Sequence, residues 1–294
     1  MTMHGSVVEI SPIKYLARIL SSGAANWLAK KNSKLKYPRL CCFPDDYIGR
    51  SIVAHGAYEE LFLIGVLDNL LKHRAGEFRG ATAVDVGANI GNHSLWFSRR
   101  FRRVVSFEPN PVCAHMLRAS VAVNGVKNIT VHEIGLGDFP GKASFAIGYD
   151  GNLGGSHIVT GPASLSPGLI EIAIESGDSI LDSNDNADER IALIKIDVEG
   201  HERAVLRGLE NTLRRHSPVV LFESMGSAQD GPDGVFNFLR SLGYKRFRSL
   251  EPRIRSRWRV LRAIDRLVFG YRLMAVEVGG LEDRFYPLIV AEVD

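Results

Sequence analysis

The sequence predicts an α/β protein built on a mostly parallel sheet of seven strands, with helices on both faces. Two observations predict this fold. Short apolar runs alternate with longer stretches of helical periodicity, and glycine-rich turns or carboxylates follow several of the apolar runs. Strands that alternate with helices of this length form right-handed βαβ units, which place neighbouring strands parallel. A chain of 294 residues, 45% of them hydrophobic, can bury the core of such a domain.

The predicted strands and helices follow one another through the middle of the chain. Strands are expected at residues 81–86, 104–108, 129–134, 191–197 and 219–224, and the segments 244–249 and 287–293 are expected to pair at the sheet edge. Helices are expected at residues 58–71, 93–101, 109–123, 202–215 and 234–242. We expect these elements to form one domain over residues 57–294.

The alternating pattern breaks between residues 142 and 175. Short β-like pieces at 143–147, 156–160 and 170–174 are separated there by glycine-rich loops. This favours a small antiparallel insertion beside the main sheet, at residues 140–176. A polar loop is expected at residues 183–190.

An N-terminal basic helical extension is expected at residues 1–56. Between residues 11 and 44 there are seven basic residues and no acidic one. Ile13, Leu16, Leu20, Trp27 and Leu28 recur at helical spacing, which indicates an amphipathic helix. The helix either packs on the domain with its basic face in solvent or contacts a membrane surface or a partner.

A second basic segment lies near the C-terminus, with ten basic and two acidic residues between 245 and 272. Trp258, Leu261, Ile264, Val268 and Tyr271 follow helical spacing, which predicts a basic helical insertion at residues 251–283. Such a helix could lie on an anionic membrane, contact nucleic acid or cap a site, or it could be a solvated helix packed on its own domain.

Composition indicates the compartment but not the partner. No window reaches the ~20 apolar residues of a spanning helix, and no secretory signal is visible. The three cysteines are not spaced as in a zinc site, and they are consistent with a protein of a reducing compartment. We therefore expect a cytoplasmic protein, with peripheral membrane contact through the basic helices as a further expectation. A net charge of +3 is too small to indicate a partner or an oligomeric state.

A glycine turn follows the first predicted strand. Gly87 and Gly91 are spaced as Gly-x-x-x-Gly, and Asp85 ends the strand. Such a turn lets backbone N–H groups approach a ligand closely. Dinucleotide sites favour Gly-x-Gly-x-x-Gly, because a third glycine lets the helix close on a pyrophosphate, and Asn89 stands where that glycine would be. The turn therefore suits a nucleoside without a pyrophosphate, and Asp85 could orient an ammonium group on it.

Glu108 ends the second predicted strand, about 20 residues beyond the turn, where an acid can accept both ribose hydroxyls. The alternative is an ordinary α/β turn with Glu108 as a surface acid. The order of strand, turn, helix and strand favours the nucleoside interpretation, with Asn110 as a further contact. Asp138, after the third strand, could reach the base, or it could be a plain turn acid.

Charged residues also follow the fourth predicted strand. Strand alternation places Lys195, Asp197 and Glu199 on one side, and Gly200 allows a sharp exit that turns His201 toward the same crevice. Buried charges at the carboxyl end of a strand are costly without a function. In the alternative interpretation, the acids complement a helix N-terminus and the lysine pairs with an acid. No spacing of His, Cys or Asp argues for a metal.

Three motifs together resemble the FkbM family of methyltransferases. They are VDVGANIG (84–91), FEP (107–109) and LIKIDVEGHE (193–202), and the likeness extends over roughly residues 58–224, including NLGGS (152–156). The resemblance implies a Rossmann-like class I methyltransferase fold and S-adenosylmethionine as methyl donor. It also implies O-methylation of a hydroxyl on a sugar, glycolipid or secondary metabolite.

Methyl transfer requires that the acceptor oxygen be aligned and lose its proton. We expect Asp197, Glu199 or His201 to orient or deprotonate the hydroxyl, with Lys195 holding the carboxylates or the acceptor; Glu223 could also face the crevice. An NAD-dependent oxidoreductase or epimerase is a rival, disfavoured by Asn89 and by the lack of a Tyr-x-x-x-Lys pair. An RNA methyltransferase is favoured only by the basic helix, so a nucleic-acid partner is not expected.

Overall fold

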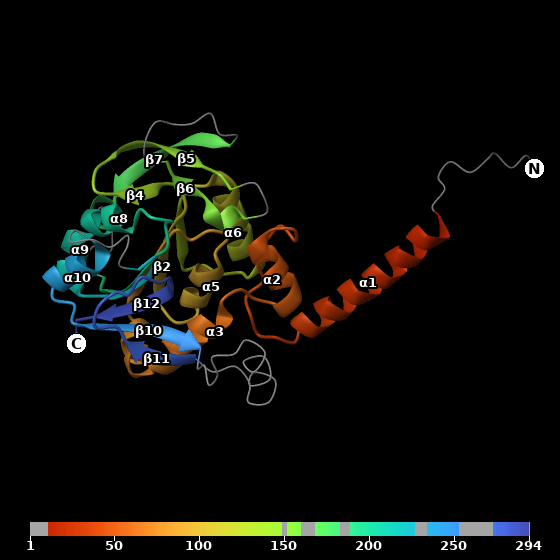
Figure 1. The fold of residues 1–294 in the computed structure, drawn as a ribbon, viewed down its shortest axis with the longest axis horizontal. Coiled ribbons are helices and arrows are strands. Elements are labelled where there is room, and N and C mark those ends of the chain that lie inside the picture. Colours follow the sequence, from red (N-terminus) through yellow and green to blue (C-terminus); the bar gives the residue numbers. More distant parts are fainter. Residues whose placement is uncertain are drawn as a thin grey trace, which may run out of the picture.

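The computed structural model describes residues 11–148, 152–159, 168–182, 189–226, 234–252 and 273–293. Its centre is a sheet of eight strands in the order β11-β10-β12-β9-β8-β1-β2-β3, and a smaller second sheet lies at the top of Figure 1. The strands of the large sheet are Thr82–Val86 (β1), Arg103–Phe107 (β2), Ile129–His132 (β3), Ile191–Ile196 (β8), Val219–Ser224 (β9), Arg246–Pro252 (β10), Leu273–Glu277 (β11) and Tyr286–Glu292 (β12).

Five strands of the large sheet are parallel, in the spatial order β3-β2-β1-β8-β9. From β1 the chain adds β2 and β3 on one side, and it later returns to add β8 and β9 on the other. The reversal between β1 and β8 is a topological switch point. Open α/β sheets bind ligands beyond the carboxyl ends of the strands at such a point.

The other end of the sheet is antiparallel and contains one more strand than predicted. β12 pairs with β9 and β10, and β10 pairs with β11, all in antiparallel register. The predicted pairing of the last two strands is thus found, and so is the predicted α/β sheet with parallel central strands. The sheet differs from the prediction in being mixed and in having eight strands rather than seven. β11 forms an exposed edge, and its residues lack the apolar alternation that marks a half-buried strand.

Two hydrophobic clusters cover the two faces of the large sheet. In β1, Val84 and Val86 belong to one cluster and Ala83 to the other, as alternation along a strand requires. Residues of α8, α9 and α10 complete the first cluster, and residues of α5 and of the helical segment 60–78 complete the second. The helices around the sheet are Asn92–Ser98 (α5), Pro111–Val123 (α6), Gly177–Asp182 (α7), Glu202–Gly208 (α8), Glu210–His216 (α9) and Val235–Ser241 (α10).

Two of the predicted helices are interrupted. The helix expected at 58–71 starts as α3 (Glu60–Leu63) and continues as a π-helix, η1 (Ile64–Leu70), before η2 (Lys72–Arg74) and α4 (Ala75–Phe78). The helix expected at 202–215 is divided at the buried Leu209 into α8 and α9. Apolar periodicity does not reveal either interruption, because the buried faces of the pieces remain aligned.

The second sheet has the order β4-β7-β5-β6 and encloses a small apolar core of its own. Its strands are Gly135–Gly137 (β4), Gly141–Ala146 (β5), His157–Ile158 (β6) and Leu169–Ser176 (β7). β5 is antiparallel to both β6 and β7, as the sequence predicted for this segment, whereas β4 pairs with β7 in parallel. Of the predicted polar loop at 183–190, residues 183–188 lie outside the described part of the chain.

The N-terminal extension contains α1 (Pro12–Asn32) and α2 (Tyr47–His55). Every residue of α1 is described and none of them is buried, and the helix projects away from the body in Figure 1. The interpretation of α1 as a helix packed on the domain is therefore wrong. In the part of the chain that the structure describes, none of the helices combines the length and hydrophobicity that a membrane-spanning segment requires.

Most of the second basic segment, residues 253–272, lies outside the described residues, and so do the five apolar positions that predicted its helix. The flanks of the predicted insertion 251–283 are described and are not helical. β10 continues to Pro252, and β11 begins at Leu273 and pairs with it. The prediction of helix over the whole of 251–283 is therefore wrong at both ends, because backbone pairing of these two strands sets the local structure there.

Candidate functional site

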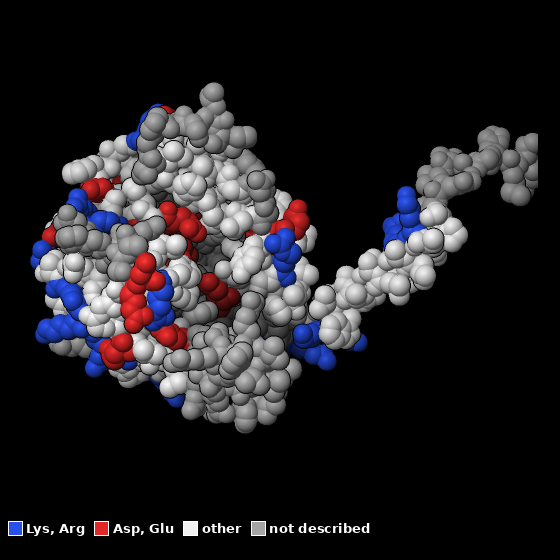
Figure 2. Space-filling model, in the orientation of Figure 1, with Lys and Arg blue, Asp and Glu red and all other residues white. Residues whose placement is uncertain are grey.

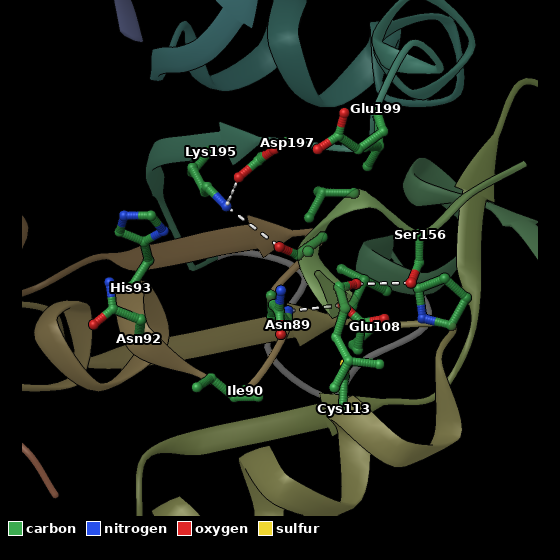
Figure 3. A pocket seen from close by; sticks show the side chains of 18 of the residues that line it. Asn89, Ile90, Asn92, His93, Glu108, Cys113, Ser156, Lys195, Asp197 and Glu199 are labelled. Carbon is green, nitrogen blue, oxygen red and sulfur yellow. Dashed lines mark hydrogen bonds and ion pairs between the residues drawn. The ribbon is translucent and has the colours of Figure 1, made fainter. Parts of the chain in front are cut away.

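A cavity of about 240 Å³ opens at the switch point of the large sheet, a volume on the scale of a small organic ligand. Figure 2 shows a hollow on this face with acidic side chains in and around it, and Figure 3 shows its lining from close by. Eight of the twelve residues named for the site from the sequence line the cavity: Gly87, Asn89, Glu108, Lys195, Asp197, Glu199, His201 and Glu223. Turns that follow β1, β2 and β8 bring most of them together.

The glycine turn after β1 packs directly against the turn after β8. Gly87 has a φ of 74°, and a Cβ on it would lie 1.8 Å from the carbonyl oxygen of Asp197. The backbone N–H of Asp197 donates to the carbonyl of Val86 at 3.1 Å. A side chain at position 87 would separate the two turns, so glycine is needed there for close approach as well as for its φ angle.

Glu108 is buried at the floor of the cavity and holds the turn in place. Its Oε2 accepts from the backbone N–H of Asn89 at 2.7 Å, and its Oε1 accepts from the N–H of Asn110 at 2.8 Å. The Asn89 bond is drawn in Figure 3. Burial raises the pKa of Glu108 to about 7, against the opposing effect of these two hydrogen bonds and of Lys195. Glu108 is therefore not a surface acid.

Two asparagines near Glu108 carry buried polar atoms that have no hydrogen-bond partner among the described residues, Oδ1 of Asn89 and Nδ2 of Asn110. Asn89 has a φ of 48°, which an asparagine adopts more readily than most residues. It lines the cavity, so its amide oxygen is available to a donor on a ligand. Asn110 caps α6 through Oδ1 and lies behind the cavity wall.

A buried lysine joins the first and fourth parallel strands. Nζ of Lys195 donates to Oδ2 of Asp197 at 3.0 Å and to the carbonyl of Gly87 at 3.3 Å, and lies 3.7 Å from Oδ1 of Asp85. Burial alone would lower the pKa of Lys195, but the two carboxylates outweigh it and raise the pKa above its ordinary value. The lysine therefore pairs with acids, as the alternative interpretation from the sequence predicted.

Asp85 is fully buried and does not line the cavity. Its Oδ2 accepts from the hydroxyl of Ser94 at 2.5 Å, and its Oδ1 faces Lys195. Asp85 was predicted to orient a ligand ammonium group directly or through water; a direct contact does not fit this placement, and the role through water stays a prediction. Asp85 holds the lysine that in turn holds Asp197.

Three carboxylates gather at the upper rim of the cavity, on Asp197, Glu199 and Glu223, with one oxygen of each within 4.8 Å of the others. Asp197 and Glu199 lie next to each other in Figure 3. Burial, followed by the neighbouring acids, raises the pKa of Glu199, and the same causes raise that of Glu223 to about 8. Such a cluster can hold a proton or a cation. The absence of a metal site therefore stays a prediction.

Replacing Glu223 with glutamine is expected to make folding stability less sensitive to pH. The carboxyl has a higher pKa in the folded state than its ordinary value of 4.5. Its contribution to the free energy of unfolding is therefore fully present below about pH 4.5 and is lost as the pH rises through about 8. Denaturant unfolding should find Glu223→Gln more stable than the parent by about 1–3 kcal/mol at pH 8.5 and similar at pH 4.5. Glu171→Gln, at an exposed position of β7, is the control, and parallel pH profiles for Glu223→Gln and the parent would contradict the burial argument.

Gly91, Asn110 and Asp138, like Asp85, are among the predicted residues that do not line the cavity. Gly91 precedes α5, with a φ of 90°, and packs on Leu117 of α6. Asp138 forms an ion pair with Arg207 at 3.8 Å. His201 lines the cavity, and burial lowers its pKa despite the acids at 138 and 202. A neutral imidazole can accept a proton, which fits its predicted role.

Sequence reasoning missed the residues that reach the cavity from the N-terminal part of the chain. Nε2 of His93 and Oε2 of Glu59 lie 3.3 Å apart on the cavity wall, next to Tyr58. Burial, followed by Glu59, raises the pKa of the Tyr58 hydroxyl above its ordinary value. His93 lies two residues beyond the glycine turn, and this position was the only feature of the sequence that could have placed it at the cavity. Glu59 has a φ of 53° that nothing in the sequence indicated.

Asp46 was also missed, although it connects α2 to the loop at 152–156. Its Oδ2 accepts from the N–H of Ile48 and caps α2, and its Oδ1 accepts from the N–H of Leu153 at 2.7 Å. The loop 152–156 is thereby tied to α2 over the cavity. Ser156 closes the base of that loop, because its hydroxyl accepts from the N–H of Gly148 and donates to the carbonyl of Leu153.

Comparison with known proteins identifies the family. The methyltransferase FkbM domain matches residues 85–246, which is more than half of the 294 residues. The hexuronic acid methyltransferase AglP of Haloferax volcanii is 31% identical over 47% of this chain and 53% of its own length. The methyltransferase sdnD of Sordaria araneosa is 28% identical over 43% of this chain and 60% of its own. The chain thus matches little more than half the length of these relatives.

One solved structure is a methyltransferase FkbM from Methylobacillus flagellatus KT. It is 22% identical, covers 61% of this chain and 42% of its own, and superposes with a TM-score of 0.41. The identification therefore depends on the domain match and on the motifs at 84–91, 107–109 and 193–202, which lie within or next to the matched range. The resemblance stated from the sequence is confirmed: the chain belongs to the FkbM family of methyltransferases.

Proposed function

We propose that this protein is an S-adenosylmethionine-dependent methyltransferase that methylates a hydroxyl group on a sugar, glycolipid or secondary metabolite. The observation that carries the proposal is the meeting of the glycine turn, Glu108 and the carboxylates of Asp197 and Glu199 in one cavity at the switch point. Family membership supports methyl transfer over the rival oxidoreductase chemistry.

The lower part of the cavity fits the nucleoside of this donor. Glu108 offers carboxylate lone pairs to ribose hydroxyls, and Asn89 offers its unpartnered Oδ1. Ile90 and Phe107 supply apolar wall that a base can contact. When bound, adenosylmethionine supplies a methyl group on a positively charged sulfur, and the acidic rim suits a cation of that kind.

The upper part of the cavity fits a hydroxyl acceptor. Asp197 is held by Lys195 and stands beside Glu199 and Glu223, so a carboxylate is in place to orient the hydroxyl and take its proton. His201 could do the same as a neutral base. The rim also argues against RNA, because a phosphate backbone would be repelled by the carboxylates. A curated relative named a hexuronic acid methyltransferase supports a sugar hydroxyl.

Calorimetric titration of the full chain with adenosylmethionine, its demethylated product and NAD tests the cofactor. Binding of the first two, with no heat from NAD, is the expected outcome. Transfer of a labelled methyl group into a fractionated cell extract, followed by identification of the labelled product, then tests the acceptor. Well-folded protein that binds neither sulfur nucleoside would overturn the proposal.

Affinity for the demethylated product is expected to rise with pH through the titration of Glu108. An ionised carboxylate is the stronger acceptor for ribose hydroxyls, and burial sets this pKa at about 7. Affinity should increase by up to about tenfold from pH 6 to pH 8 and then level off. Glu108→Gln should bind at least about tenfold more weakly and with a flatter pH profile. An unchanged profile in that variant would place the titrating group elsewhere.

A further inference from the structure

One face of α1 is apolar, and no part of the chain that the structure describes covers it. Ile13, Leu20 and Trp27 are exposed at 82%, 65% and 64% of their surface. At ~3.6 residues per turn these three fall on one face with Leu16, and Arg18 falls on the opposite face. Solvent exposure of so many large apolar side chains on one helix indicates that something else covers them.

The C-terminal end of α1 is fastened to the body, and the rest of the helix is not. Nδ2 of Asn32, the last helical residue, donates to the carbonyl of Val53 in α2 at 2.8 Å. The chain that follows is held again where Arg99 donates to the carbonyl of Lys36 and where Arg39 pairs with the side-chain amide of Asn124. Contact with the body ends at the C-terminal end of the helix, and the rest extends into solvent in Figure 1.

Charge decides which partner suits this helix. Residues 11–44 carry seven basic side chains and no acidic one. Figure 2 shows blue side chains toward both ends of α1 and an uncharged surface between them. Lys31 lies at the C-terminal end of the apolar face, and its Nζ lies 5.6 Å above the ring of Trp27. An aromatic ring beside lysines is typical of helices that lie at the interface of a lipid headgroup layer.

We propose that α1 is a membrane-surface helix that binds bilayers containing anionic lipid, with its apolar face in the headgroup region and its lysines on the lipid phosphates. A second copy of the chain is the main competing occupant. Pairing two such helices would bring eight basic side chains together with no acid among them, whereas an anionic bilayer neutralises them. The proposal does not depend on the methyl-transfer function.

Flotation of the full chain with lipid vesicles tests the proposal. Vesicles of phosphatidylcholine with about one third phosphatidylglycerol should carry the protein upward, and pure phosphatidylcholine should carry at least about tenfold less. Salt at about 0.5 M should weaken the binding strongly. Leu16→Asp with Leu20→Asp, on the apolar face, should reduce partitioning at least about tenfold.

The matched control is Ser22→Asp with Ala25→Asp, which makes the same change of charge on the opposite, exposed face of the helix. It should retain more vesicle binding than the apolar-face variant, while both keep the parent melting temperature because α1 buries nothing. Equal losses of vesicle binding in the two variants would show that only net charge matters, and would overturn the proposed insertion of the apolar face. Vesicle binding absent in the parent, or light scattering that shows a dimer abolished by the leucine substitutions, would overturn the membrane assignment.

Discussion

Replacing Gly87 with alanine should abolish binding of adenosylmethionine and destabilise the fold by roughly 3 kcal/mol or more. Gly87 adopts a φ of 74°, which strains any residue with a Cβ, and that Cβ would lie 1.8 Å from the carbonyl oxygen of Asp197. The neighbour is backbone rather than the end of a flexible side chain. The two turns must therefore separate, and the N–H of Asn89 would leave Glu108 with them.

Gly125 provides a matched control for this substitution. It has a φ of 64° and no atom within 4 Å of where a Cβ would be, and it lies outside the site, just after α6. Gly125→Ala should cost only about 1 kcal/mol of backbone strain and leave binding unchanged. Thermal unfolding and calorimetry of both variants separate strain from close contact. Equal behaviour of the two alanine variants would show that the approach of the two turns does not matter.

The part of the site that sequence reasoning located depends on local rules. The carboxyl ends of parallel strands meet at one edge of a sheet, so Gly87, Glu108 and Asp197 had to come together once their strands were recognised. Burial of each strand is visible as an apolar run. The same rule did not show that Asp85 lies behind the cavity wall, because alternation gives the face of a side chain and not its depth.

The part that was missed depends on contacts between segments far apart in the chain. Asp46 reaches Leu153 across more than one hundred residues, and His93 meets Glu59 only because the N-terminal segment crosses the cavity. The π-helix over 64–70 and the exposed edge strand β11 carry no distinct apolar period. In α1 the predicted helical period was correct, and of the two interpretations only packing on the domain was wrong, since an amphipathic pattern alone does not state what covers the apolar face.

Lys195 explains why charges can be buried between the two turns. Its ammonium group stands between Asp85 and Asp197, so the carboxylate inside the wall and the carboxylate on the cavity share one positive charge. Removing either partner of a buried pair leaves the other uncompensated. A substitution that tests the chemistry of Asp197 must therefore keep an acceptor for the lysine, which asparagine does and alanine does not.

Asp197→Asn should lower methyl transfer at least about a hundredfold, within the usual range for a proton acceptor, and leave affinity for adenosylmethionine within about threefold. The amide can still accept from Nζ of Lys195, which now lies 3.0 Å from the carboxylate, but it cannot take the proton of the acceptor hydroxyl. Labelled-methyl transfer and calorimetry on the same protein sample measure the two effects.

Two further variants serve as the control for Asp197→Asn and as the test of the neighbouring carboxylate. Asp68→Asn makes the same chemical change at an ion pair with Arg100, away from the cavity lining, and should leave transfer unchanged. Glu199→Gln examines the neighbouring carboxylate, and a loss confined to that variant would move the role of base from Asp197 to Glu199. Nζ of Lys195 also donates to the carbonyl of Gly87, so Asp197 is linked to the glycine turn through this lysine. If Asp197→Asn lost cofactor affinity together with methyl transfer, the role of the carboxylate would be to hold that turn rather than to accept a proton.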